Sequence, residues 1–166
     1  MDYISELPDD IFRRIHLNFD VHNVLGSKEE LLKLGYLHEV IEYYNDEEAV
    51  VKYLDWSLCG DKFIKLVDQS VNSFRGTKID SFLVNFKLYH KQSSTIDQWI
   101  NFSLSKGVER IDLLFDDGMP YVYNEHGDTV YNRYKLPFGI FSNFNASTTL
   151  KRLCLRVVEA LKLENM

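Results

Sequence analysis

The side chains that most often carry out chemistry in proteins are few in this sequence and lie far apart. Histidine occurs at positions 16, 22, 38, 90 and 126, and no two of these have the spacing of a metal-binding motif with a third ligand. The two cysteines, Cys59 and Cys154, form neither a metal motif nor a redox motif. No glycine-rich phosphate-binding loop occurs. The sequence therefore predicts a chain with no catalytic residue, no metal and no cofactor.

Two groups of polar residues come closest to an active site. Asp116 and Asp117 could form half of an acidic metal site, although a pair of solvated loop charges is a far more common arrangement. His126 and Asp128 suggest a triad with a serine, but no nucleophile-elbow motif accompanies them. Neither group predicts a reaction, so an enzyme is the least favoured class of function.

The tyrosines of the same region fit a different role. They are Tyr121, Tyr123, Tyr131 and Tyr134. Tyrosine is enriched at protein–protein contacts because it combines a large area with a polar tip. These residues are therefore a candidate partner surface, and the alternative is that they pack over the edge of the fold. Residues 121–131 contain two short alternating runs around a glycine-containing turn, which predicts a β-hairpin.

Composition excludes several classes of protein. The chain has 166 residues, of which 45% are hydrophobic, enough for one domain with a real core. A net charge of −6 and the lack of a Lys/Arg cluster disfavour binding to nucleic acid or to anionic lipid. No secretory signal and no apolar run of membrane-spanning length are visible. We expect an intracellular protein, cytoplasmic or nuclear, that is neither secreted nor membrane-bound.

The elements that would position any site are clearest between residues 79 and 115. Residues 79–86 and 108–115 share one pattern of apolar positions, whose second half alternates as in a half-buried strand. Between them Ile96, Trp99, Ile100 and Leu104 form one face of a helix. Ser94 and Asp97 have the spacing of a capping box, and Gly107 suits the helix C-terminus. This order of strand, helix and strand predicts two parallel strands.

The same pattern occurs a third time at residues 150–157. The three copies begin at residues 79, 108 and 150, which are 29 and 42 residues apart. The shorter spacing lies at the upper end of the range for leucine-rich repeats. We expect an α/β fold with a short leucine-rich-repeat-like solenoid of about three parallel strands with helices. The alternative is an ordinary α/β domain whose strands happen to look alike.

The first 60 residues are expected to be all α. Pro8, followed by two aspartates, is typical of the first turn of a helix over residues 2–16. Ser27 and Glu30 form a second capping-box spacing, and residues 27–58 are interpreted as helical. The predicted organisation has three parts: a first helix at residues 1–16, a helical segment at 17–60, and a repeat domain at 61–166 that ends shortly after its third strand. Asp61 is expected to cap a helix that Gly76 terminates.

Residues 2–16 and about 61–157 together resemble a known family. The first segment matches the start of an F-box at Asp2, Ile4, Ser5, Leu7, Pro8, Asp9, Ile11 and Ile15. The second contains Phe63, Val67, Asp68 and Val71, then Trp99 and Ile100, then the run from Gly107 to Leu113, and finally Leu136-Pro137 and Thr149-Leu150-Lys151. In this order these motifs resemble the plant F-box/leucine-rich-repeat family of the FBD type. Residues 17–58 do not match the remainder of the F-box.

The resemblance implies a substrate-recognition adaptor of a Skp–cullin–F-box ubiquitin ligase. Its first helix would dock on the Skp-type adaptor through Leu7, Pro8, Ile11 and Ile15, and its repeats would hold a target protein. Because the F-box is incomplete, a second interpretation stays open. The chain would then be a non-catalytic repeat module, or a truncated relative, that does not bind the Skp-type adaptor.

Overall fold

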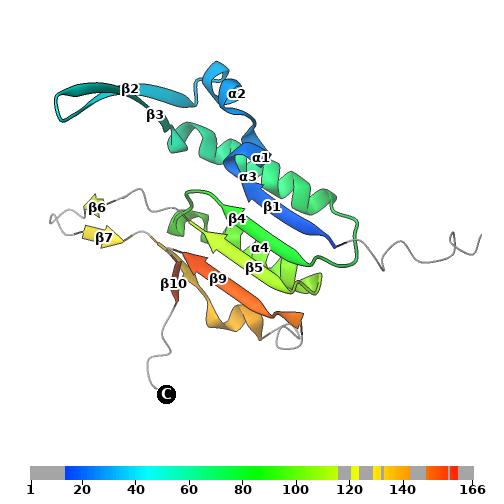
Figure 1. The fold of residues 1–166 in the computed structure, drawn as a ribbon. Helices are drawn as coiled ribbons and strands as arrows, with labels where there is room; N and C mark the ends of the chain where they lie inside the picture. The colour runs from blue at the N-terminus through cyan, green and yellow to red at the C-terminus, as the bar shows by residue number, and fades with distance from the viewer. Residues whose placement is uncertain are drawn as a thin grey trace, which may run out of the picture.

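The computed structural model describes residues 14–115, 121–123, 129–131, 133–142, 149–156 and 158–160 (Figure 1). Its centre is a sheet of four parallel strands: β1 (His16–Asp20), β4 (Ser81–Asn85), β5 (Arg110–Leu114) and β9 (Arg152–Arg156). Their order in the sheet is β1-β4-β5-β9. The three strands predicted from the repeated pattern are therefore confirmed as parallel neighbours. The strand β1 was not expected.

The register of the four strands aligns their apolar positions in rows. Phe82 pairs with Leu17 on one side and Ile111 on the other, and Ile111 pairs in turn with Leu153. A second row contains Phe19, Val84, Leu113 and Leu155. Because alternate side chains of a strand share one face, both rows lie on the same face of the sheet. That face forms the core, in which Phe82, Val84 and Ile111 are fully buried.

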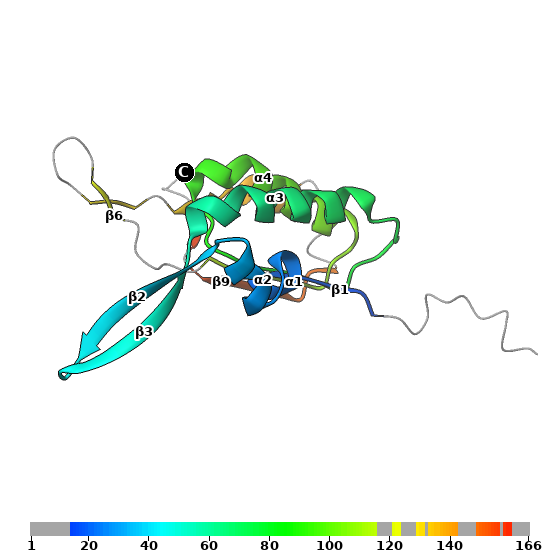
Figure 2. The same ribbon diagram turned by 90° about the horizontal axis from the view of Figure 1, so that it is seen from above.

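Two helices cover this apolar face. Figure 2 shows α3 (Trp56–Ser73) and α4 (Ser93–Ser105) side by side on one side of the sheet. The expected apolar face of α3 is confirmed, since Phe63, Val67 and Val71 are buried. The ring of Phe63 stacks on Phe86 after β4 with centroids 3.8 Å apart.

Both helix starts differ from the prediction. The helix α3 begins five residues before Asp61, and Asp55 accepts a hydrogen bond from the Leu58 N–H at 3.2 Å instead. The helix α4 begins at Ser93, so Ser94 lies inside the helix and not at its cap, and the cap residue Gln92 makes no capping hydrogen bond. The carboxylate of Asp97, the expected capping partner, accepts a hydrogen bond from Tyr134. At its other end, Gly107 takes the expected positive φ of 64°.

The N-terminal region corrects the expectation of an all-α segment. Between residues 14 and 55, only α1 (Val21–Leu25) and α2 (Lys28–Lys33) are helices, and α2 has the predicted capping box between Ser27 and Glu30. Residues 37–54 instead form an antiparallel hairpin of β2 (Leu37–Tyr44) and β3 (Glu47–Leu54), which projects from the body. Its β-branched and aromatic residues favour strands.

The C-terminal region contains several short elements. They are η2 (His90–Gln92), β6 (Tyr121–Tyr123), β7 (Thr129–Tyr131), β8 (Tyr134–Leu136), η3 (Phe138–Phe141) and β10 (Val158–Ala160). The predicted hairpin is confirmed, because β6 pairs with β7 in antiparallel orientation. The strand β10 pairs with β8 in a separate parallel sheet. No helix in the described parts of the chain is long and apolar enough to cross a membrane.

The α/β prediction is thus confirmed as a parallel sheet with helices on one face. A regular solenoid is not shown by these elements and stays a prediction.

Candidate functional site

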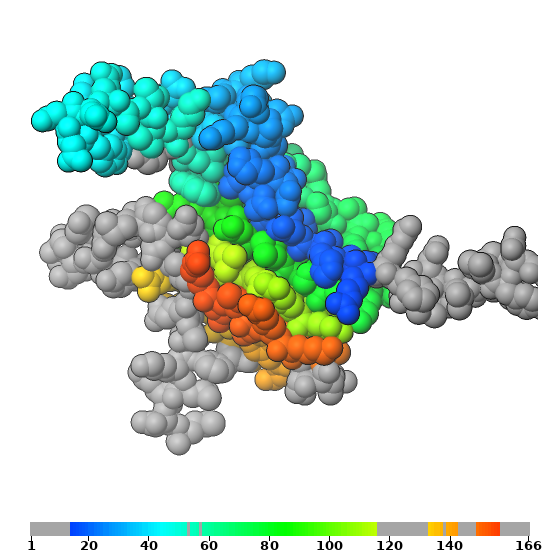
Figure 3. Space-filling model, viewed as in Figure 1, coloured from blue at the N-terminus to red at the C-terminus, as the bar shows by residue number. Residues whose placement is uncertain are grey.

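The second face of the sheet is a surface that the fold builds from four strands. We call it the open face, because neither α3 nor α4 covers it (Figure 3). The strand alternation assigns to it His16, Asn18, Asp20, Ser81, Leu83, Asn85, Arg110, Asp112, Leu114, Arg152, Cys154 and Arg156. These positions come from four strands but lie in three rows, so residues far apart in sequence meet on one surface.

A network of charges lies where the strands begin. The carboxylate of Glu109 accepts hydrogen bonds from Lys78 at 3.4 Å and from Lys151 at 3.1 Å. The hydrogen bonds from Lys151 and Lys78 lower the pKa of Glu109. Asp80 accepts a hydrogen bond from the Ile15 N–H at 2.6 Å, and its other oxygen lies 3.6 Å from Lys78. This network links the residues that directly precede all four strands, at the edge of the open face where the strands begin.

Asp112 is the most unusual residue of the open face. It lies at the centre of β5, opposite Leu83 and Cys154, and it is only 3% exposed. Its Oδ2 atom accepts a hydrogen bond from Arg110 Nε at 2.6 Å, whereas Oδ1 is buried and has no partner among the described residues. Burial of a carboxylate is costly unless it is paired, so Arg110 is essential to this arrangement.

The charges on the open face are unevenly distributed. Arg152 and Arg156 are exposed at the two ends of β9, and Arg110 is exposed beside them on β5. The opposite half presents uncharged polar residues such as Asn18 on β1 and Ser81 on β4. A surface of this kind attracts a partner with carboxylates toward the β9 side.

One pair on the open face resembles a fragment of a catalytic site. His16 Nδ1 and Ser81 Oγ are 2.7 Å apart, although the two residues are separated by 65 positions in sequence. In a hydrolase, a third group orients the histidine and backbone donors stabilise the oxyanion. Within the described part of the chain no third side chain is hydrogen-bonded to this pair, and no group of three metal-binding side chains occurs. The pair therefore forms a cross-strand contact between β1 and β4.

A groove runs beside β1 at the edge of the sheet. It has a volume of about 720 Å³, and its lining includes Asn18, Asn23, Gln69, Ser70 and Arg75. The groove lies between the edge strand, α1 and α3, so backbone groups of β1 and amide side chains face the same space. It extends the polar part of the open face around the sheet edge.

The structure places the residues predicted from sequence in different surroundings. Leu7, Pro8 and Ile11 lie outside the described residues. Ile15 precedes β1 in an extended segment and not in the expected helix, since its carbonyl accepts hydrogen bonds from the backbone of Asp80 and Ser81.

The tyrosine cluster is divided. Tyr121, Tyr123 and Tyr131 belong to β6 and β7, and their side chains lie outside what the structure describes. Tyr134 is fully buried, which corrects its assignment to a partner surface. Its hydroxyl donates a hydrogen bond to Asp97 at 2.5 Å, and both burial and this bond raise its pKa. Tyr134 therefore packs within the fold, as the alternative interpretation of the tyrosines expects.

Asp112, His16 and the β9 arginines were not identified as site residues from sequence. The alternation of the repeated pattern could have assigned Asp112, Arg152 and Arg156 to one exposed face, but the role of His16 required the position of β1. Comparison of the chain with protein-family models, with curated proteins and with solved structures gave no match.

Proposed function

We propose that the chain is a protein-binding module that holds a target on the open face of its sheet. The observation that carries this proposal is the arrangement of the face itself: in-register strands bring arginines, amides and a buried carboxylate onto one surface that neither α3 nor α4 covers. Rigid strands fix the relative positions of such groups, as a binding surface requires.

The family resemblance extends this proposal to a ubiquitin-ligase adaptor. In that function Leu7, Pro8 and Ile11 dock on a Skp-type adaptor while the open face holds the substrate. The docking residues precede β1 in the sequence, since β1 begins at His16. A short helix with three or four apolar anchors buries a few hundred Å² of apolar surface, which is worth roughly several kcal/mol before the cost of association.

A second candidate function is a repeat module that does not bind a Skp-type adaptor. It is favoured by the structure of residues 17–54, which form β1, α1, α2 and the β2–β3 hairpin and not the further helices of an F-box. In addition, the backbone of Ile15 is already engaged by β4 and its preceding residue. Ile15 would therefore contribute little to docking.

Calorimetric titration of the chain with a Skp-type adaptor separates the two functions. Binding tighter than roughly 1 µM that is lost in Leu7→Ala/Pro8→Ala supports the ligase adaptor. The matched control is Leu58→Ala, which truncates an exposed leucine of α3 and should leave binding unchanged. A folded chain that shows no heat of binding at concentrations about a hundredfold higher excludes the ligase connection and leaves the repeat module.

A further inference from the structure

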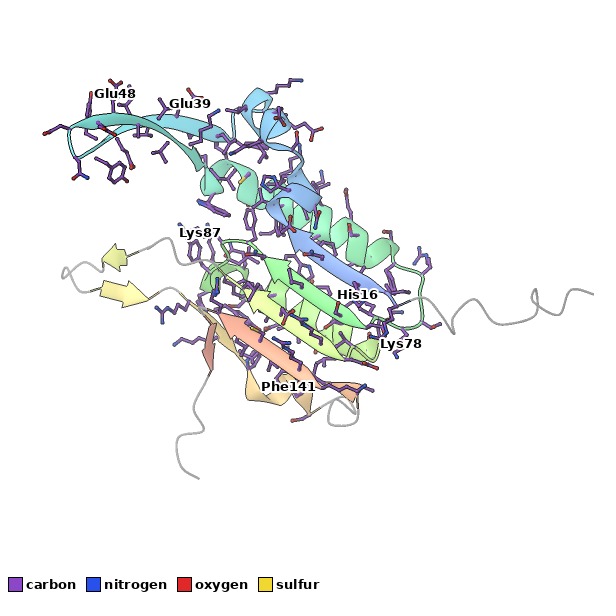
Figure 4. All side chains as sticks on the ribbon, in the orientation of Figure 1. His16, Glu39, Glu48, Lys78, Lys87 and Phe141 are labelled. Carbon is purple, nitrogen blue, oxygen red and sulfur yellow. The ribbon has the colours of Figure 1, made fainter. Side chains whose placement is uncertain are left out.

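The β2–β3 hairpin exposes an unusual amount of apolar surface. We call residues 37–54 the arm. Its exposed large apolar residues are Val40, Ile41, Tyr43, Tyr44 and Val50, with exposed fractions between 44% and 72%. Figure 4 shows the arm extending away from the body, with Glu39 and Glu48 labelled on it. Among the arm residues whose side chains the structure describes, only Leu37 and Leu54, at its base, pack against the core.

A projecting two-stranded hairpin is an incomplete structure. Two strands alone are marginally stable in water, and a third strand or a packed face is normally needed. The strands β2 and β3 pair only with each other among the described elements, so each leaves one edge open. Open edges readily pair with a strand from another chain. The question is which strand suits this edge.

The geometry of the turn identifies the backbone groups available on β3. Asn45 and Asp46 form a two-residue loop with φ values of 51° and 64°, typical of a type I′ turn. In such a hairpin the flanking pair, Tyr44 and Glu47, exchanges the backbone hydrogen bonds, and bonded and non-bonded pairs then alternate. The N–H and C=O groups of Glu48, Val50 and Lys52 therefore point to the free edge of β3.

The side chains at these three positions suit pairing with a second copy of the same strand in antiparallel orientation. Val50 is central, and Glu48 and Lys52, which have opposite charges, lie two residues to either side of it. We propose that the arm joins two copies of this chain by antiparallel pairing of β3 with β3 about a twofold axis at Val50. Val50 then lies opposite Val50 of the second copy, and Glu48 lies opposite Lys52 of the second copy, twice. All three positions point their backbone groups to the free edge, so the register also satisfies the backbone hydrogen bonds.

The same register completes rows of side chains across four strands. Within one copy Glu39 is paired with Lys52 at 3.3 Å, and Ile41 lies opposite Val50. In the dimer, Lys52 would lie between Glu39 of its own copy and Glu48 of the second copy. The two Ile41–Val50 pairs would meet at the axis and form a continuous apolar row on one face. The dimer would thereby pair the free edge of β3 in both copies and bring the two Val50 side chains into contact.

Charge favours this register over its neighbours. A shift of the register by two residues in either direction places Lys52 opposite Val50 or Asp46 and leaves Glu48 without a lysine. Residues 37–54 contain five carboxylates, Glu39, Glu42, Asp46, Glu47 and Glu48, and a single lysine. Two arms would therefore repel each other unless Lys52 is correctly placed.

The arrangement also separates the two bodies. Leu54 lies four residues from Val50, which is roughly 13 Å along a strand, and the twofold axis places the second body beyond the tip of the first arm. The arm projects well beyond the sheet, so it can reach a partner at this distance (Figures 1 and 2).

Sedimentation equilibrium of the full chain and of two charge variants tests the proposal. The wild type should dimerise, and Glu48→Lys and Lys52→Glu should each weaken dimerisation by about tenfold or more, because each places like charges opposite each other twice. An equimolar mixture of the two variants should recover a dimer, because each lysine then faces a glutamate of the other copy. Two unfolded variants could not recover in this way.

Matched controls change the same charges elsewhere. Asp61→Lys and Lys65→Glu alter exposed positions of α3 and should dimerise as the wild type does, alone and mixed. A wild type that stays monomeric, or a dimer that neither arm variant weakens, overturns the proposal. A mixture of the two arm variants that stays monomeric also overturns it, since the β3 register would then be wrong.

Discussion

Tyr134 and Asp97 are joined by a hydrogen bond of 2.5 Å that links β8 to α4 at the boundary of the core. The phenol ring is fully buried and packs edge-on against Phe115, with centroids 5.9 Å apart. The bond therefore ties the short C-terminal elements to the main helix layer.

Removal of this hydroxyl should destabilise the fold. Tyr134→Phe keeps the ring but leaves the half-buried Asp97 carboxylate without this donor, and we expect a loss of about 1–3 kcal/mol in the free energy of unfolding. Urea unfolding followed by circular dichroism measures the difference. Tyr43→Phe is the matched control, because Tyr43 is 72% exposed on the arm. Equal unfolding midpoints for wild type and Tyr134→Phe would contradict the structural role of the bond.

Alkaline pH should destabilise the folded protein, because the thiol of Cys59 and the hydroxyl of Tyr134 ionise less readily in the folded state than in the unfolded chain. Burial raises the pKa of the Cys59 thiol from 9.0 to about 11, and burial together with Asp97 raises the pKa of Tyr134. A raised pKa in the folded state means that the unfolded chain ionises first. The contribution of the protonated Cys59 thiol to the free energy of unfolding is complete below pH 9 and is lost as the pH approaches 11.

This dependence can be measured by urea unfolding at a series of pH values from 8 upward. The free energy of unfolding should fall above pH 9, and the fall should be shallower in Cys59→Ala. An unchanged slope in that variant would mean that the thiol does not contribute to the pH dependence.

Arg110 should be needed only because Asp112 is present. Arg110→Ala removes the sole described partner of a carboxylate that is 3% exposed, and we expect a loss of about 1–3 kcal/mol. Replacing both residues, as Arg110→Ala/Asp112→Leu, should recover most of the loss, because Asp112 lies opposite Leu83 and an apolar side chain fits there. Chemical denaturation of the two variants tests this. A double variant less stable than the single one would show that the carboxylate has a further partner.

The arginines of β9 should determine binding to acidic partners. A hexaglutamate peptide is a simple probe of the open face, and its binding should weaken as salt concentration rises. Arg152→Glu/Arg156→Glu should lower the affinity by about tenfold or more, as measured by fluorescence anisotropy of a labelled peptide. Lys65→Glu/Lys91→Glu changes the same charge on α3 and η2 and serves as the control. Equal losses in both double variants would indicate non-specific attraction.

The sequence was most informative where one pattern repeats. The alternation around Phe82, Ile111 and Leu153 predicted three parallel strands and their shared apolar face, because a single buried face leaves little freedom of register. The spacing of Phe63, Val67 and Val71 fits the buried side of α3, because residues four apart share one face of a helix.

The arm was misinterpreted because its residues fit two periods. Val40, Ile41 and Tyr44 have the three- and four-residue spacing of a helix, yet they also belong to a strand whose neighbours are β-branched or aromatic. Asn45 and Asp46 lie inside the segment expected to be helical, whereas they form a two-residue hairpin loop. In residues 37–54 the strand propensity of the side chains and the conformation of the turn determine the structure, and the helical spacing of the apolar residues does not.

The residues of the candidate site could not be predicted from the sequence for a different reason. His16 meets Ser81 only because β1 pairs with β4 across 65 residues, and nothing local to either residue indicates that contact. Asp112 looks like an ordinary outward-facing polar residue in its strand. Its burial depends on neighbouring strands, which a pattern within one strand does not report.

The base of the arm has a consequence for how the chain folds. Leu37 and Leu54 are a cross-strand pair, so the arm leaves the body and returns at the same place. A hairpin forms within about 10 µs, whereas closing a long loop costs entropy that grows with its length. Early formation of the arm would shorten the effective distance between β1 and β4, and these strands would then meet sooner than their separation in sequence suggests.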